Sequence, residues 1–375
     1  MEVFMTAKKF LVVAAALLFA AHFAFGAGQG EVDVADWPDR PIEIVVGWSA
    51  GGTSDTTARA LAGPMSDYLG VEVQVTNMEG ANGGIAYQTV ADSPPNGYRL
   101  FGGAQVQATY PITEQAQVGW QVMYPFPAGM GATTIYVRTD SGYDSIEDLV
   151  EAIEDSDRTV NYGHTSRGGN GHIFGEAFIE AAGLQGQVSD IPYDGGREAG
   201  NRLIAGDVEF IAVSLGDVAD WAEEGTLEPL LNLYSEDYEW RGVTFPSVAN
   251  YYPELVNFTS INPYWGFAVH RDTPDEIVVK LAEAFEYATQ QESFTTALEN
   301  RGIIVAPTIG EEADEAAAIV GAGRGWAQYE YGIVDNSPAQ FDIPELQNWE
   351  FPYDEESANI RPWPPEVEDI ADLLP

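Results

Sequence analysis

The sequence predicts an α/β fold built as two lobes, and three observations carry this prediction. Residues 41–55 form an apolar, β-branched run that leads through a glycine turn into the start of a helix. The same order of strand, glycine-rich turn and helix returns at residues 158–181. A strand, a helix and a second strand in succession are typical of a largely parallel sheet. Two such units, well separated along the chain, predict two lobes that each direct a loop toward a shared crevice.

The helix after the first turn is predicted from its apolar spacing, and Gly70 is a typical residue for its end. Residues 71–75 then alternate between apolar and polar side chains, as a strand does, and complete the first unit. The apolar residues that share one face of this helix are Ala58, Leu61, Ala62, Met65 and Leu69.

Local signals place several later elements. Ser145 and Asp148 have the spacing of a capping box, which predicts a helix from residue 146. Thr273 followed by Pro274 has the pattern of an N-cap and a first helical residue. Gly206 is expected to end another helix and to lead into a strand.

The charge balance is strongly acidic. The chain has 16 lysines and arginines against 59 aspartates and glutamates, a formal net charge of −43. Phosphate contacts require lysine and arginine, so the composition argues against a nucleic-acid partner. An acidic surface on a globular chain is typical of proteins that stay soluble in concentrated salt, which predicts a halophilic source. A generic acidic exported protein is the alternative.

The sequence has no cysteine, which excludes disulfides and a lipid on an N-terminal cysteine.

The two ends of the chain differ from the rest. Residues 1–26 are predicted to be a signal peptide, because Lys8 and Lys9 precede an apolar run and cleavage is expected near Gly26 and Ala27. The mature chain is therefore expected to be exported and soluble, with a retained membrane anchor as the alternative. Residues 336–375 interleave prolines with aromatic residues. Because proline prevents long helices and aromatic residues favour burial, this acidic extension is expected to wrap over a lobe as irregular chain.

The turn at residues 49–55 is predicted to bind an anion. Backbone N–H groups and the positive end of a helix converge there without any basic side chain. Asp55 is expected mainly to cap the helix and shape the turn. The same segment, Gly47–Gly51, also matches the G-x-S-x-G nucleophile elbow, so a serine hydrolase with Ser49 as the nucleophile remains the alternative.

A second polar turn precedes the helix of the second unit. Thr165, Ser166 and Asn170 supply polar side chains at this helix start, and Arg167 is either a bidentate carboxylate partner or a surface ion-pair residue. His164 and His172 flank the turn, but no third ligand with convincing spacing follows, so no metal is expected.

The order of these motifs resembles the solute-binding component of tripartite tricarboxylate transporters. A Trp-Pro-x-Arg-Pro-Ile opening precedes the first turn, and a Tyr-Gly segment followed by a Gly-x-x-His pattern begins the second unit. Five motifs appear in the family's order, at Trp37–Ile42, Ala50–Asp55, Gly80–Gly84, Pro95–Tyr98 and Pro192–Gly196.

This resemblance implies a two-lobed periplasmic-binding-protein fold of type II, known as a Venus flytrap. It implies a periplasmic receptor, monomeric, without cofactor, metal or catalytic activity. The ligand is expected to be a small organic carboxylate, either a dicarboxylate, a tricarboxylate or an aromatic acid. The partners are expected to be integral-membrane permease subunits. Lobe 1 is expected at 37–132 and 263–335 and lobe 2 at 133–262, with hinges near residues 133 and 262.

The resemblance also implies the ligand-binding residues. The turn after the first strand is expected to form one side of the cleft and the second polar turn the other. A later Pro-Tyr-x-Gly-Gly turn, a serine at a strand end and the loop after residue 103 are expected to complete it. The implied residues are Ser49, Ala50, Gly51, Gly52, Ser54, Asp55, Ala104, Gln105, Thr165, Ser166, Arg167, Asn170, Tyr193, Asp194, Gly195 and Ser214.

Overall fold

The computed structural model describes residues 34–341, 343–345 and 360–375, apart from the side chains of residues 104–106 and 260. The predicted signal peptide lies outside the described residues. Residues 34–37 belong to a separate N-terminal unit with one short 3-10 helix, η1 (Val34–Asp36), and the chain from Pro38 onward forms the other unit. Among the described helices, none has both the length and the apolar character needed to cross a membrane.

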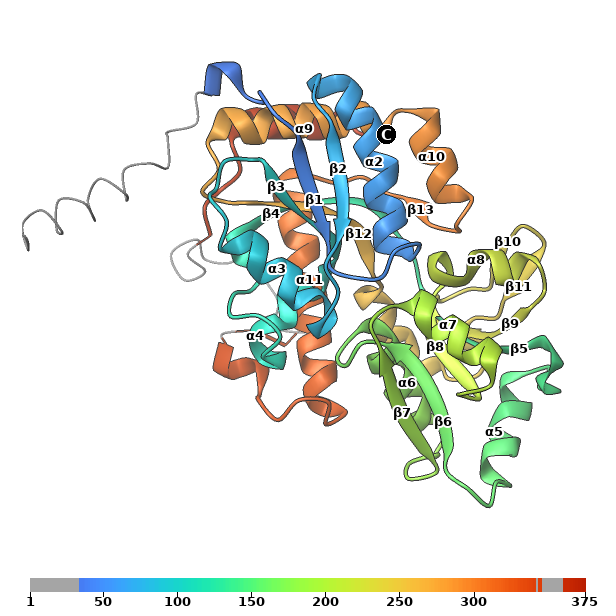
Figure 1. The fold of residues 1–375 in the computed structure, drawn as a ribbon. Helices are drawn as coiled ribbons and strands as arrows, with labels where there is room; N and C mark the ends of the chain where they lie inside the picture. Colours follow the sequence, from blue (N-terminus) through green and yellow to red (C-terminus); the bar gives the residue numbers. More distant parts are fainter. Residues whose placement is uncertain (1–33, 342, 346–359) are drawn as a thin grey trace, which may run out of the picture. The chain divides into compact units, whose positions relative to one another are not determined.

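The larger unit contains a sheet of six strands in the order β13-β4-β12-β3-β1-β2 (Figure 1). β1 runs parallel to β2 and β3, whereas β12 is antiparallel to both β3 and β4. The short β13 is antiparallel to β4 at the edge. The strands are β1 (Ile42–Val46), β2 (Val73–Asn77), β3 (Arg99–Ala104), β4 (Met123–Met130), β12 (Tyr264–His270) and β13 (Ile304–Val305).

A second sheet has five strands in the order β7-β6-β8-β5-β9. β6 is parallel to β7 and β8, and β5 is antiparallel to β8 and β9. Both sheets are therefore mixed, and the prediction of largely parallel sheets was wrong for the strands next to each passage of the chain between the sheets. The strands are β5 (Thr133–Arg138), β6 (Val160–Thr165), β7 (Val188–Tyr193), β8 (Phe210–Ser214) and β9 (Leu227–Asn232), and β10 (Tyr238–Trp240) pairs separately with β11 (Val243–Phe245).

Helices cover both sheets. Those of the first sheet are α2 (Thr53–Leu69), α3 (Gly84–Ala91), α4 (Tyr110–Thr113), α9 (Asp275–Thr289), α10 (Glu292–Glu299) and α11 (Gly310–Glu330). Those of the second sheet are α5 (Ile146–Glu154), α6 (Asn170–Ala181), α7 (Gly196–Ala205) and α8 (Leu215–Glu223). The 3-10 helices are η2 (Ala81–Gly83), η3 (Gln105–Thr109), η4 (Trp120–Val122), η5 (Thr139–Ser141), η6 (Val248–Asn250), η7 (Pro253–Ile261) and η8 (Pro338–Phe341).

Most of the predicted helix boundaries are confirmed. The hydroxyl of Ser145 accepts a hydrogen bond from the Asp148 N–H at 3.2 Å, so the capping prediction for α5 is correct. Gly70 and Gly206 end α2 and α7 in the left-handed conformation that glycine adopts without strain. The N-cap of α9 was wrong by one residue, because Pro274 takes that position. Thr273 lies before it, and its buried hydroxyl has no hydrogen-bond partner.

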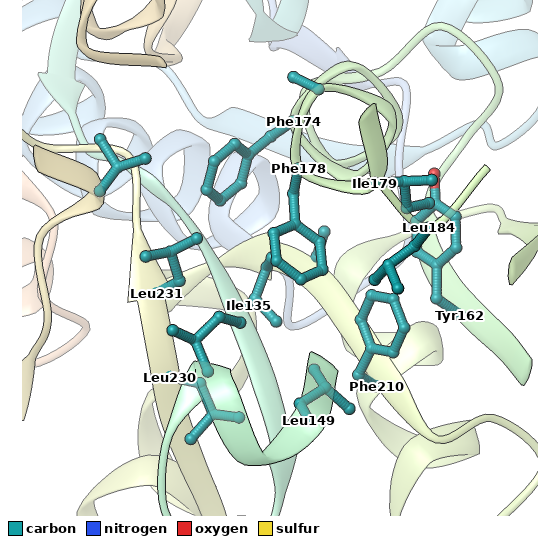
Figure 2. Packing of buried hydrophobic residues seen from close by; sticks show 14 of the residues in the cluster. Ile135, Leu149, Tyr162, Phe174, Phe178, Ile179, Leu184, Phe210, Leu230 and Leu231 are labelled. Carbon is teal, nitrogen blue, oxygen red and sulfur yellow. The ribbon is translucent and has the colours of Figure 1, made fainter. Parts of the chain in front are cut away.

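Aromatic packing fixes the second sheet against its helices (Figure 2). The rings of Tyr162 on β6 and Phe210 on β8 stack with centroids 5.2 Å apart, and Phe178 of α6 meets Phe210 edge-on. Burying one such side chain contributes about 1.5–3 kcal/mol. This core packs β6 against α6, and the turn between these two elements is one of the two predicted ligand loops.

The chain passes between the two sheets where β4 ends at Met130 and β5 begins at Thr133, and again between η7 and β12. The C-terminal segment then returns to the first sheet. Trp363 lies with its ring 4.5 Å from that of Tyr124 on β4, and the Tyr124 hydroxyl donates to the carbonyl of Pro362 at 2.7 Å. The described C-terminal residues 360–375 of the extension therefore pack on the first sheet. They are less irregular than expected, since Pro365 begins a short helix, α13 (Pro365–Ala371).

Candidate functional site

A cavity of about 40 Å³ lies where the starts of four helices, α2, α6, α7 and α8, come together. Each helix N-terminus carries the equivalent of about half a positive charge. The cavity is lined by Trp48, Ser49, Gly52, Thr53, Ser54, Asn82, Thr165, Gly169, Asn170, Gly171, Gly195, Gly196, Val213, Ser214, Asp217 and Trp265.

The turn before α2 is shaped by Asp55. Its carboxylate accepts hydrogen bonds from the Gly51 N–H at 2.9 Å and from Nε of Arg59 at 3.0 Å. The amide of Asn77 donates to the same carboxylate at 3.1 Å and also to the carbonyl of Trp48. Burial acts to raise the pKa of Asp55, but these donors outweigh it and lower the pKa. Asp55 therefore stabilises the turn through hydrogen bonds and is not among the residues that line the cavity.

Asp217, in the first turn of α8, joins the two sheets. Its Oδ1 accepts the Thr53 N–H at 2.8 Å and the Thr53 hydroxyl at 2.9 Å. The carboxylate also interacts with the backbone of Ser214, at the start of its own helix. Burial raises the pKa of Asp217 despite these hydrogen bonds. One buried carboxylate thus serves the N-termini of two helices that belong to different sheets.

The turn between β6 and α6 is held by two residues from the first sheet's side, one on α11 and one that follows α4. Its backbone is sharply bent, with positive φ at Ser166 and Gly168. The Gln328 amide of α11 donates to the Gly168 carbonyl at 2.7 Å, and the Gln115 amide donates to the Arg167 carbonyl at 2.7 Å. The Arg167 side chain is exposed and does not line the cavity.

Directly beneath this turn, the rings of His164 and His172 stack with centroids 4.3 Å apart. Nδ1 of His172 accepts the Gly168 N–H at 3.0 Å, so its Nε2 carries the proton that faces Asp190 at 3.6 Å. Nδ1 and Nε2 of His164 lie 3.2 Å from the Ser166 carbonyl and 3.3 Å from Asp190. His164, His172 and Asp190 place three possible metal ligands within 4.8 Å of one another, so the expectation that no third ligand joins the two histidines was wrong. The arrangement favours a hydrogen-bonded cluster that supports the turn.

Replacing His172 with asparagine is expected to flatten the acid dependence of stability. Burial and the neighbouring His164 hold the pKa of His172 well below its ordinary value of 6.5. The unfolded chain takes up this proton near pH 6.5 and the folded chain only at lower pH, so acidification favours unfolding. Wild type should lose up to about 1.4 kcal/mol per pH unit through this residue below pH 6.5. Asparagine keeps an acceptor for the Gly168 N–H and does not titrate.

The measurement is urea unfolding of both proteins between pH 7 and pH 4.5. The two proteins share all other titrating groups, so the difference between the two pH profiles reports the protonation of His172 together with the change that its loss causes in the neighbouring Asp190. Parallel profiles would show that its protonation does not differ between the folded and unfolded states.

The structure brings seven of the sixteen expected residues to the cavity wall. Of the others, Ala50, Arg167 and Asp194 are exposed, and Asp55 and Ser166 support the turns. Gly51 precedes the lining residue Gly52, and Tyr193 pairs with the lining residue Thr165 in the sheet. The side chains of Ala104 and Gln105 lie outside the described part. The seven that line the cavity are Ser49, Gly52, Ser54, Thr165, Asn170, Gly195 and Ser214.

Several lining residues were not expected, among them Asn82, Asp217 and Trp265. Ser214 and Asp217 have the spacing of a helix-capping pair, a local signal that points to a helix start at the cavity. Trp265 lies on β12, whose place in the first sheet depends on contacts with distant strands. No local pattern therefore predicted its position.

The geometry does not assemble a serine hydrolase site around Ser49. Its hydroxyl is buried and has no hydrogen-bond partner. The ring nitrogens of His164 and His172 interact with backbone groups and with carboxylates. A nucleophilic serine needs a base within hydrogen-bond reach. Among the described residues, none serves Ser49 in this way.

Comparison with known proteins agrees with the topology. A Cupriavidus necator protein, "UPF0065 protein in gbd 5'region", is 27% identical over 302 residues, which cover 78% of this chain and 88% of the relative. A solved R. palustris structure with adipate has a TM-score of 0.71 at 23% identity and covers 80% of this chain and 99% of its own. The Rhodopseudomonas palustris protein MatC with bound malate has a TM-score of 0.63 at 22% identity, with 79% and 98% covered.

The two mixed sheets with helix starts facing one cavity define a two-lobed periplasmic-binding-protein fold of type II. The profile of the "Tripartite tricarboxylate transporter family receptor" matches residues 57–318. The chain belongs to this family of transporter receptors.

Proposed function

We propose that the protein is a periplasmic receptor that binds a small organic carboxylate between its lobes and delivers it to membrane permease subunits, without catalysis. The observation that carries this proposal is the meeting of four helix N-termini at one polar cavity. Four such ends supply about two positive charges in total, against one negative charge on Asp217. The remaining positive potential suits one carboxylate group.

The lobes of this proposal follow the two sheets. Lobe 1 comprises residues 37–132 and 263–335, and lobe 2 comprises residues 133–262, with hinges where the chain passes between them. Closure brings the turns of the two lobes onto the ligand. Asn170, Thr165 and Ser54 line the cavity and are proposed to donate to the carboxylate. A hydrogen bond to a charged group contributes about 1.5–3 kcal/mol.

The ligand class is tested by thermal shift and calorimetry with malate, adipate, citrate and benzoate. At least one of them should raise the melting temperature and bind with measurable heat. Asn170→Ala should weaken the binding of that acid about tenfold or more, because it removes one donor to a charged group. Arg167→Ala is the matched control, since it lies in the same turn with an exposed side chain, and it should change affinity less than threefold.

Silence with all four acids would argue against a carboxylate receptor. Equal losses in the two variants would show that the site lies elsewhere. The hydrolase alternative has its own test, because a nucleophilic Ser49 would react with a fluorophosphonate probe and Ser49→Ala would not.

A further inference from the structure

Arg324, in the middle of α11, is fully buried and has no carboxylate partner among the described residues. Its Nε and Nη1 have no hydrogen-bond partner, and Nη2 lies 3.4 Å from the Gly168 carbonyl. Burial lowers its pKa to about 10, where the guanidinium is still protonated at neutral pH. Arg271, the other buried arginine in the described chain, pairs with Asp314 at 2.5 Å. Arg324 is therefore a buried cation without a counter-ion from the described chain.

Such an arrangement is energetically unfavourable by itself. Removing a charged group from water costs several kcal/mol unless an opposite charge and hydrogen bonds compensate it. The chain carries 59 aspartates and glutamates, yet no described carboxylate lies against this guanidinium. Its electrostatic neighbours are the neutral phenols of Tyr110 and Tyr264. The described part of the chain therefore does not supply the compensating charge.

The residues that interact with the guanidinium adjoin the wall of the cavity. Gly168, which the guanidinium contacts, precedes the lining residue Gly169. Tyr264 precedes the lining residue Trp265, and the Tyr110 hydroxyl donates to the carbonyl of the lining residue Asn82 at 2.8 Å. Arg324 itself does not line the cavity. An anion at Arg324 would therefore be separate from the proposed ligand and in contact with the turn that forms one side of its site.

We propose that Arg324 binds a small free anion of halide size, chloride in most solutions. Two guanidinium nitrogens without partners supply its hydrogen bonds, and the enclosed position favours an anion with a small radius over an organic acid. The bound anion neutralises Arg324 and holds α11 against the turn at Gly168. This site goes beyond the proposed function, because it needs no carboxylate ligand to be occupied.

The direct test is a crystal of the wild-type protein grown in sodium bromide with malate, with diffraction measured at the bromine absorption edge. The expected result is an anomalous peak within hydrogen-bond distance of the Arg324 guanidinium. Water, a carboxylate of the protein, or a carboxylate of malate at that position would overturn the proposal. The last outcome would assign Arg324 to the ligand site, and it would leave the receptor function standing.

A solution test uses the melting temperature at rising sodium chloride for wild type, Arg324→Met and the exposed control Arg202→Met. The general effect of salt on this acidic chain is common to all three. An anion bound only to the folded state adds stability by mass action. Wild type and the control should gain at least about 2 °C more than Arg324→Met over the titration. At the lowest chloride, Arg324→Met should be at least as stable as wild type, since it removes an uncompensated buried charge. Equal responses to chloride would overturn the proposal.

Discussion

Replacing Asp217 with alanine is expected to weaken binding of the carboxylate ligand about 10–100-fold. Asp217 accepts both the N–H and the hydroxyl of Thr53 across the two sheets, and these bonds exist only when the lobes are together. Hydrogen bonds to a charged acceptor contribute about 1.5–3 kcal/mol each. When the lobes separate, water forms hydrogen bonds with the groups that are released and recovers part of this free energy. The net stabilisation of the closed form is therefore smaller than the sum of the two hydrogen-bond energies. The loss should appear mainly as faster dissociation, measured by stopped-flow fluorescence.

Asp207→Ala is the control, since Asp207 pairs with Arg202 at an exposed position and both residues belong to lobe 2. Exposed ion pairs contribute about 0–1 kcal/mol, so affinity should change by less than about fivefold. Tighter binding by Asp217→Ala would contradict the prediction. It would mean that the buried carboxylate competes with the ligand for the N-terminus of α2.

Gly195→Ala is expected to lower affinity by about 5–150-fold through a steric effect alone. A Cβ at Gly195 would lie 1.9 Å from the Ser49 hydroxyl oxygen and 3.1 Å from the Ser49 Cβ. Gly195 has an extended backbone, so alanine adds no conformational strain of its own. Overpacking of a tight contact costs about 1–3 kcal/mol. Because this contact joins the two lobes, the cost falls on the closed form, and calorimetry should show weaker binding with little change in melting temperature without ligand.

The second variant in this test is Gly195→Ala combined with Ser49→Gly. The double variant removes both conflicting atoms and leaves the Ser49 backbone nitrogen at 3.4 Å, an ordinary contact. Affinity should recover most of the loss, after allowance for Ser49→Gly alone. If the double variant binds no better than Gly195→Ala, the two residues do not meet in the closed form in solution.

The sequence predicted those parts of the site that follow from local pattern. The β1–α2 and β6–α6 turns were placed by strand, glycine and helix signals within about twenty residues, and seven expected residues line the cavity. The polar residues of a turn were not resolved into those that face the cavity and those that do not. Arg167 shows the reason, because the positive φ values of Ser166 and Gly168 set the direction of the side chain between them.

Contacts between segments that are distant along the chain could not be predicted from the sequence. Asp217 meets Thr53 from 164 residues away, and Asp190 lies 26 residues from His164. Nothing in the spacing of these residues indicates either contact. The mixed direction of the sheets was missed for the same reason, since β12 finds its place between β3 and β4 only in the folded chain.

The strand order of the first sheet also sets a sequence of events during protein synthesis. β12 is the strand that joins β3 to β4, and it is made after all five strands of the second sheet. The segment 133–232 contains every strand of its own sheet and is complete first. Domains tend to fold as units as they are synthesised. The half that contains the six-stranded sheet begins nearest the N-terminus, yet it is expected to finish folding last, after β12 has left the ribosome.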